Sequence, residues 1–330
     1  MLTESLGRIA GLSAALVAAI VVASIVIVRQ PSFSNVPRLL KRRADPDRLR
    51  TDIAFLTRDA SPRDARHPEK LELAAAYIGA ELLKSGAAVA SQPYDVHGRA
   101  FRNVVARLGP RGPGAFVLGA HYDSFGETNL NPGADDNASG VAGLLEVARL
   151  LGSEPLARPL VLVAYCTEEP PYYHSEFMGS AVHAASLKDS DAPPIGMVSL
   201  EMIGYFHEKQ PWPSPLFALA YPTRGDFIAV VGRWADRRLV KELRRGINAA
   251  STVAAYSYSG PAISGTEASD HSSYWAEGYT AAMVTDTAFM RNPNYHAPTD
   301  TLETLDFERM AQVVTGVANA AAEICGLASP

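Results

Sequence analysis

Cysteine is scarce in this sequence, and its scarcity excludes two kinds of architecture. Among 330 residues there are only two cysteines, Cys166 and Cys325, and neither belongs to a CxxC motif or a histidine-rich cluster. Two cysteines are too few for a disulfide framework, and their isolation argues against a thiolate metal site. A fold held together by disulfides is therefore not expected.

An excess of positive charge is also missing. The 30 basic residues are outnumbered by 35 acidic ones, and no long basic run is interleaved with aromatic residues outside the N-terminal region. We therefore expect no nucleic-acid partner. Apolar side chains are plentiful: at 47% of the residues they are enough to bury a large core.

One long uncharged apolar run stands at the N-terminus, over residues 9–28. At a rise of about 1.5 Å per residue, a helix of this length crosses the hydrocarbon core of a bilayer. We predict a transmembrane anchor over residues 1–29. The alternative is a cleaved signal peptide, but the run exceeds the usual apolar region of about 7–15 residues and lacks a small-x-small cleavage site before a polar start.

After this run, the sequence predicts a short linker followed by one large domain. Residues 30–46 are rich in Pro, Ser and Arg and show no apolar periodicity, which is typical of a juxtamembrane linker. The remaining residues, 47–330, are expected to form one catalytic domain.

The periodicity of the domain predicts an α/β fold. Apolar residues at helical spacing indicate helices over about 68–84, 141–151 and 307–324. Short runs rich in Val and Leu indicate strands at 115–120, 160–165, 197–200, 227–231 and 281–284. This order predicts a three-layer α/β/α fold, in which helices flank a mostly parallel, mixed central sheet on both faces.

Polar residues follow several of these strands at their carboxyl ends, where ligands collect in open α/β sheets. His121 ends the first strand, and Asp123 follows two residues later, on the same side of an extended chain. A metal-bound imidazole usually donates its second N–H to a carboxylate or carbonyl, so Asp123 is a candidate to orient His121. A single histidine in such a place is more often structural.

Two pairs of adjacent acids add to this picture. Asp135 and Asp136 lie in a glycine-rich loop ahead of a helix, where capping explains some of the polar residues but leaves one carboxylate free for a metal. Glu168 and Glu169 follow a seven-residue apolar run, and the alternation of an extended chain sends their side chains in different directions. One carboxylate suits a ligand and the other a base.

Two further residues complete a candidate metal site. Glu201 stands among apolar residues, where an unpaired carboxylate is costly to bury, and His296 lies in a turn after the last strand. Two histidines and several carboxylates at strand ends provide nitrogen and oxygen ligands that zinc accepts. A paired site with a bridging carboxylate can be built from them.

These motifs, in this order, resemble the co-catalytic two-zinc aminopeptidase family that also includes glutamate carboxypeptidases and glutaminyl cyclases. The likeness covers about residue 50 to the C-terminus and implies the fold of a zinc exopeptidase. It also implies that Asp135 bridges two zinc ions, that His121 and Glu201 complete one site, and that Glu169 and His296 complete the other. Glu168 becomes the general base.

The resemblance suggests two further features and contains one departure. It suggests a cis peptide bond between Asp135 and Asp136, and a hydrogen-bonding role near the ligands for Asp270, whose alternative role is to cap the helix near Tyr274. The departure is Glu201, because many aminopeptidases of the family have Asp at this position.

The expected function is therefore a zinc-dependent aminopeptidase that acts on peptide substrates. One alternative is a glutaminyl cyclase with a single zinc, and another is a receptor-like relative without catalysis, although all the ligand positions are filled here. The resemblance favours an extracytoplasmic domain, whereas the five basic residues that follow the apolar run indicate a cytoplasmic one under the positive-inside rule. The sequence indicates no oligomeric state.

Overall fold

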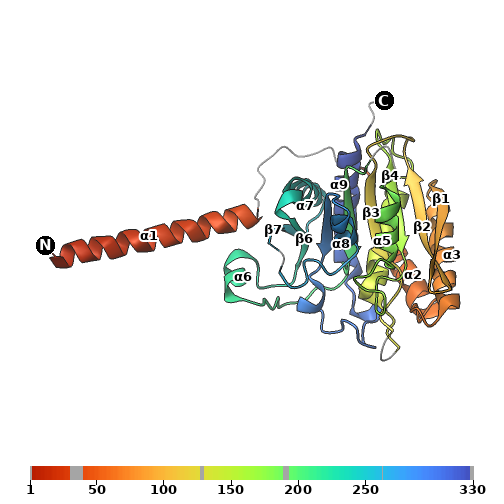
Figure 1. Cartoon of the computed structure of the whole chain (residues 1–330), viewed down its shortest axis with the longest axis horizontal. Coiled ribbons are helices and arrows are strands. Elements are labelled where there is room, and N and C mark those ends of the chain that lie inside the picture. The colour runs from red at the N-terminus through yellow and green to blue at the C-terminus, as the bar shows by residue number, and fades with distance from the viewer. Residues whose placement is uncertain (1, 30–39, 127–129, 189–192, 262, 328–330) are drawn as a thin grey trace.

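The computed structural model describes residues 2–29, 40–126, 130–188, 193–261 and 263–327, without the side chains of residues 2–10, 28 and 216. One eight-stranded sheet forms the centre of the molecule, in the order β1-β2-β4-β3-β5-β8-β6-β7 (Figure 1). In chain order the strands are β1 (Ala88–Val96), β2 (Arg99–Leu108), β3 (Phe116–His121), β4 (Leu160–Tyr165), β5 (Gly196–Glu201), β6 (Phe227–Arg233), β7 (Ala254–Gly260) and β8 (Ala281–Thr285).

The sheet is mixed, as the sequence predicts. The four strands β4, β3, β5 and β8 run parallel to one another. β2 pairs antiparallel with β4, and β6 pairs antiparallel with β8 but parallel with β7. β1 and β2 form an antiparallel hairpin at the other edge, and His97 and Gly98 at its tip both have positive φ, as a tight two-residue turn requires. The carboxyl ends of the four parallel strands therefore meet at one edge.

Helices cover both faces of the sheet, and the alternation of strand residues shows which face each one covers. Leu118 of β3 belongs to a core cluster with residues of α4 (Gly140–Leu151) and α9 (Phe307–Cys325). Its neighbour Val117 instead packs with residues of α5 (Gly179–Ser186) and α8 (His271–Ala276). Three more helices, α2 (Pro46–Ala54), α3 (Pro68–Lys84) and α7 (Arg237–Ala250), contact α4 or α9. The predicted α/β/α layers are confirmed.

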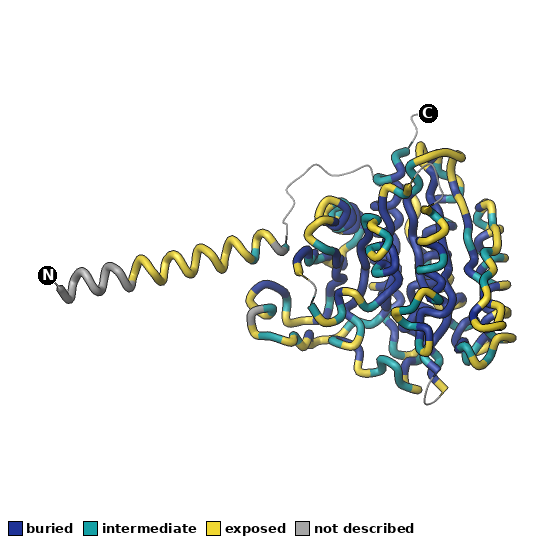
Figure 2. Tube along the Cα trace, viewed as in Figure 1, coloured by how far each residue is buried: buried dark blue, intermediate teal, exposed yellow. Residues whose placement is uncertain are grey.

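The N-terminal helix α1 (Leu2–Arg29) extends away from this body (Figure 1), and most of the residues whose burial is described are exposed (Figure 2). Within the residues that the structure describes, no helix has the length and apolar character needed to span a membrane. The predicted anchor includes side chains at residues 9, 10 and 28 that lie outside the described part of the chain.

Most of the predicted linker, residues 30–39, also lies outside the described residues. Its last part contacts the body: Leu40 N donates to Asn319 Oδ1 at 3.2 Å, and Ala44 N donates to Thr315 Oγ1 at 3.0 Å, both on α9. The packed domain thus includes residues from about Leu40 onward.

Candidate metal centre

The catalytic candidates gather at the carboxyl ends of the parallel strands. His121 is the last residue of β3 and Glu201 the last residue of β5, while Glu168 and Glu169 follow the end of β4 by a short turn. His296 approaches from the loop after β8. The ends of neighbouring parallel strands lie at one edge, which explains how residues so far apart in sequence come together.

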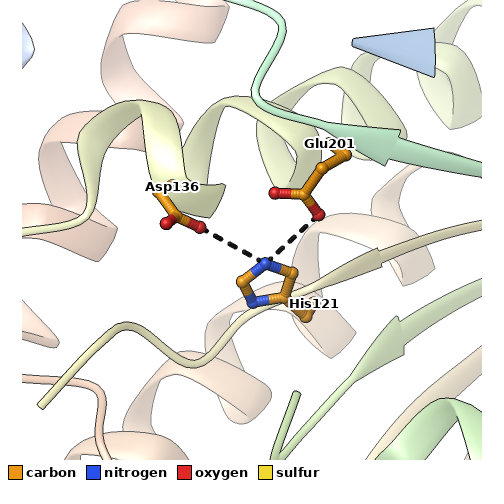
Figure 3. Close-up of side chains that lie close together, drawn as sticks. All are labelled: His121, Asp136 and Glu201. Atoms are coloured by element: carbon orange, nitrogen blue, oxygen red, sulfur yellow. Dashed lines mark ion pairs between the residues drawn. The ribbon is translucent and has the colours of Figure 1, made fainter. Parts of the chain in front are cut away.

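Two groups of possible ligands share one carboxylate, that of Asp136. His121 Nε2 lies 3.4 Å from Asp136 Oδ1 and 3.4 Å from Glu201 Oε2, and the three side chains point toward one another (Figure 3). His296 Nε2 lies 3.2 Å from Asp136 Oδ2 and 3.4 Å from Glu169 Oε2. In each group the three ligand atoms lie within 4.8 Å of one another.

The donor set fits zinc. Both groups offer imidazole nitrogen and carboxylate oxygen, which are ordinary zinc ligands. Glu169 Oε1 is buried and has no hydrogen-bond partner among the described residues, and a buried carboxylate oxygen without a donor is costly unless a cation compensates it. His121, Asp136 and Glu201 are also buried, so a cation there would be largely shielded from water.

The shared acid is thus Asp136, where the sequence predicted Asp135. Asp135 Oδ1 instead accepts a hydrogen bond from Gly204 N at 2.9 Å, and its Oδ2 accepts one from Asn292 Nδ2 at 2.8 Å. Asp135 therefore holds the loop through Gly204 and Asn292 and does not face the histidines. The turn of residues 134–139 has non-helical backbone angles at Asp136 and Asn137, and its two acids contact different partners: Asp136 faces the histidines and Asp135 does not.

The expected cis peptide bond is present, one residue later than predicted. It joins Asp136 to Asn137 and not Asp135 to Asp136. The loop is held by Asp300, whose two carboxylate oxygens accept hydrogen bonds from the backbone N–H groups of Asp135 and Asp136 at 2.9 and 3.0 Å. Asn137 fastens its other end by donating to Leu200 O at 2.8 Å.

Asp123 connects His121 with the glutamate pair. Its Oδ1 lies 3.4 Å from His121 Nδ1, and its backbone oxygen lies 3.2 Å from the same nitrogen. The carboxylate also accepts hydrogen bonds from Glu168 N at 3.2 Å and Glu169 N at 3.0 Å. This placement agrees with the orienting role expected for Asp123 and adds a second task, that of holding the Glu168–Glu169 turn.

The Glu168 carboxylate lies beside the first group, with Oε2 3.9 Å from His121 Nε2. Burial raises the pKa of Glu168 well above its ordinary value, and although His121 opposes this, the neighbouring carboxylates of Glu169 and Glu201 add to it. A carboxylate with a raised pKa and a position beside the ligands is suited to accept and return a proton.

The charges of the site strongly perturb its histidines. Burial opposes protonation of His121, but the carboxylates of Glu201 and Glu168 raise its pKa well above the ordinary value. In His296, burial is likewise outweighed by Asp136 and Glu169, and the pKa rises to about 10. In Asp136, the two histidines outweigh burial and hold the pKa well below its ordinary value.

Asp270 occupies the N-cap position of α8, but its side chain makes neither of the hydrogen bonds expected of it among the described residues. Its carboxylate oxygens are buried without a hydrogen-bond partner among the described residues, and its side chain makes no capping hydrogen bond to α8. Burial raises the pKa of Asp270 to about 7. The contact with the ligand group comes from the preceding residue, because Ser269 Oγ donates to Glu201 Oε2 at 2.7 Å.

An apolar pocket adjoins the ligand groups over β6, β7 and β8. Glu201 and Tyr295 belong to its lining, and Ala229, Val231 and Met283, which pack together on one face of β6 and β8, form its floor on the sheet. Its walls are mostly aromatic and come from the segment around α6 (Pro215–Ala220), from β6 and β7, and from the segment after β8: Trp212, Phe217, Tyr221, Phe227, Tyr256, Tyr258 and Phe289. The pocket offers an apolar side chain a place beside the metal centre.

A model of peptidase family M28 matches residues 103–321. This chain belongs to peptidase family M28. The family implies peptide substrates, and the prediction of a zinc exopeptidase is confirmed.

Relatives of the M28 chain agree with the family match. It is 43% identical over 301 residues to the uncharacterized protein YfbL of Escherichia coli, covering 88% of this chain and 92% of that protein. It is 28% identical over 228 residues to a probable leucine aminopeptidase 1 of Trichophyton verrucosum, covering 66% of this chain but only 56% of the fungal protein. The M28 chain thus spans about half the length of that relative.

Solved structures show the same fold. BSAP, a zinc aminopeptidase from Bacillus subtilis, matches 87% of this chain and 96% of its own with a TM-score of 0.67 and 16% identity. A Bacteroides thetaiotaomicron glutaminyl cyclase matches 87% of this chain and 98% of its own with a TM-score of 0.65 and 18% identity. At these identities the likeness establishes the fold of the M28 chain and leaves its substrate open.

Proposed function

We propose that this M28 chain is a two-zinc aminopeptidase that removes large apolar residues from the N-termini of peptides. The observation that carries the proposal is the pair of ligand groups with Asp136 in both. His121 and Glu201 complete one group, and Glu169 and His296 complete the other. When bound, zinc supplies Lewis acidity that lowers the pKa of a water molecule and polarises a scissile carbonyl.

Glu168 is the proton carrier in this proposal. Its carboxylate takes a proton from the attacking water as the carbon–oxygen bond forms, and it returns the proton to the leaving amine as the carbon–nitrogen bond breaks. Its raised pKa supports this role, because a base must hold the proton until the amine leaves. Asp123 keeps the Glu168 backbone in place by accepting its N–H.

The apolar pocket supports the choice of substrate. Its aromatic walls reach Glu201, so a side chain bound there places the neighbouring peptide carbonyl next to the ligand groups. The printed names of the fungal relative and of the Bacillus structure, a leucine aminopeptidase and a zinc aminopeptidase, support the same reaction.

The membrane anchor is a separate proposal and rests on the apolar run of residues 9–28. The described side chains of α1 support it, because large apolar residues such as Leu12, Leu16 and Ile20 are exposed along the helix. We favour an extracytoplasmic domain. Fractionation and protease treatment of intact cells test both points: a chain found in the soluble fraction contradicts the anchor, and a domain protected from protease contradicts the orientation.

Metal analysis together with product analysis tests the catalytic proposal. We expect about two zinc ions per chain and release of the first residue from peptides with a free N-terminus but not from N-acetylated ones. One zinc per chain with cyclised N-terminal glutamine as the product indicates a glutaminyl cyclase. A chain that binds no zinc and turns over neither substrate is a receptor-like relative.

A further inference from the structure

A fully buried arginine lies beneath the metal centre, in a part of the chain that precedes the family match. Arg63 stands in the segment between α2 and α3, and its relative exposure is 0%. A buried guanidinium is costly unless its donors are satisfied, so its partners indicate what it does.

The hydrogen bonds of this guanidinium end on backbone carbonyl oxygens. Nε donates to Tyr122 O at 2.8 Å, and one terminal nitrogen donates to Leu56 O at 2.7 Å and to Pro132 O at 2.8 Å. The other terminal nitrogen donates to Gly133 O at 2.9 Å. The planar fork of arginine suits such divergent acceptors, whereas the single ammonium group of lysine does not.

Three of these carbonyls belong to the two ends of one loop. Tyr122 directly follows His121, and Pro132 and Gly133 shortly precede Asp136. Arg63 therefore contacts the chain directly after His121 and shortly before Asp136, and so connects the segments that hold these two ligand candidates. The backbone adds a further connection, because Ser124 N donates to Arg63 O at 2.9 Å.

The same loop contacts a third ligand. Phe125 stacks on the His296 ring, with ring centroids 4.0 Å apart and an interplanar angle of 10°. The loop is also packed tightly against the segment that holds Arg63, since a Cβ atom at Gly126 would lie 2.3 Å from Asp64 Cβ. A displacement of the loop would thus disturb His121, Asp136 and His296 together.

The charge of Arg63 suits this place. Burial lowers the pKa of Arg63 to about 10, against the opposing effect of the carboxylates of Asp123, Asp300, Asp136 and Glu169. The side chain therefore remains a cation at neutral pH and offsets part of the negative charge gathered around the centre.

We propose that Arg63 is a positioning residue that fixes residues 122–126 and 130–133, and through them His121, Asp136 and His296, in the arrangement that binds zinc. The inference rests on the proposed zinc function of this site. Residues that orient metal ligands typically change metal affinity by about 10–100-fold when replaced. A residue needed for stability alone would not have this effect.

Arg63→Lys tests the proposal, with Arg149→Lys as its matched control. Arg149 is partly buried among several acceptors, the carboxylates of Asp52, Glu81 and Glu146, and in the described part of the chain its ion pairs do not include the ligand groups. Zinc affinity is measured by competition with a chelator, alongside Tm, kcat and KM. We expect the Tm of both variants to fall. Only Arg63→Lys should bind zinc about 10–100-fold more weakly, and its kcat should fall by a larger factor than its KM changes.

An Arg63→Lys variant with a lowered Tm but unchanged zinc affinity and kcat overturns the proposal. The wild-type chain separates this failure from that of the proposed function: if the wild type neither binds zinc nor cleaves peptides, the proposed function is wrong before any variant is made.

Chemical rescue provides a second test if Arg63→Lys does not fold. Arg63→Ala is prepared with and without millimolar guanidinium, which can occupy the space left by the side chain. Recovery of zinc affinity together with Tm supports the positioning role, and recovery of Tm alone contradicts it. A chain that folds under neither condition shows a general requirement for folding and also overturns the proposal.

Discussion

The Asp136 carboxylate contacts His296, with Oδ2 3.2 Å from His296 Nε2. Its other oxygen, Oδ1, lies 3.4 Å from His121 Nε2. One carboxylate thus faces both histidines, each through a different oxygen. In the proposed two-zinc site, Asp136 would therefore contribute one oxygen to each ligand group. The neighbouring Asp135 has both of its oxygens occupied by other partners and faces away.

Substitution of the two acids should separate these roles. Asp136→Asn removes the charge shared by both ligand groups, and we expect it to lose most bound zinc and nearly all activity. Asp135→Asn changes an acceptor behind the loop, so we expect zinc to be retained while stability falls by about 1–3 kcal/mol. Metal analysis and thermal unfolding of both variants check this, and the reverse pattern would restore Asp135 as the bridge.

Which of Asp135 and Asp136 faces the histidines depends on tertiary contacts of their turn. Apolar runs mark the strand ends, so the sequence predicts that His121, Glu201 and the Glu168–Glu169 pair lie at one edge of the sheet, and the structure places them there. Which of two adjacent acids faces that edge depends on a turn held by Asp300, from a distant loop. No local pattern at the two acids contains that information.

The same limit applies to parts of the fold. β3, β4, β5, β6 and β8 are continuous apolar runs, so their existence was predictable, although their order in the sheet was not. β7 reads Ala-Ala-Tyr-Ser-Tyr-Ser-Gly, a half-polar edge strand that only its pairing with β6 makes evident. Arg63, Ser269 and Asn292 reach the metal centre only through the tertiary fold, so the sequence around each of them does not predict these contacts.

Glu168→Gln tests the proton carrier. The amide keeps the size of the side chain but cannot accept the proton, and Glu168 belongs to neither ligand group. We expect unchanged zinc content and a fall in kcat of about 10²–10⁴-fold. Steady-state kinetics beside metal analysis provides the measurement, and an enzyme of normal activity refutes the assignment.

The raised pKa values of the site predict how zinc binding depends on pH. The His296 pKa rises from 6.5 to about 10, so below that pH zinc must displace a proton from the ring. Apparent affinity should therefore tighten by about tenfold per pH unit for each proton displaced. Competition with a chelator at several pH values measures this slope, and a pH-independent affinity contradicts the prediction.

Stability of the metal-free chain should change in the opposite sense. The folded chain holds the proton of His296 more tightly than the unfolded chain does, because the pKa of the ring is raised. This effect stabilises the fold fully below about pH 6.5 and is lost as the pH rises to about 10. Glu169 acts in the same direction, because burial raises its pKa from 4.5 to about 7 and its ionisation in the fold is unfavourable. The gap in Tm between zinc-loaded and metal-free protein should widen with pH, and thermal scans of both forms measure it.

The floor of the apolar pocket predicts how specificity can be changed. Ala229 and Val231 lie on β6, on the same side of the strand as Phe227, and both line the pocket. Ala229→Leu fills space that a large side chain would occupy, whereas Val231→Ala enlarges it. Because one methylene group in such a pocket changes discrimination by about 1–3 kcal/mol, we expect Ala229→Leu to lower kcat/KM for peptides with N-terminal Phe by about 10-fold or more.

Peptides with N-terminal Ala are the internal control, since a small side chain leaves the floor of the pocket empty. Their kcat/KM should change little in Ala229→Leu, and Val231→Ala should retain or improve activity on N-terminal Phe. An equal loss for both peptides in Ala229→Leu would mean that the effect does not arise from filling the pocket, and the pocket would then not bind the N-terminal side chain.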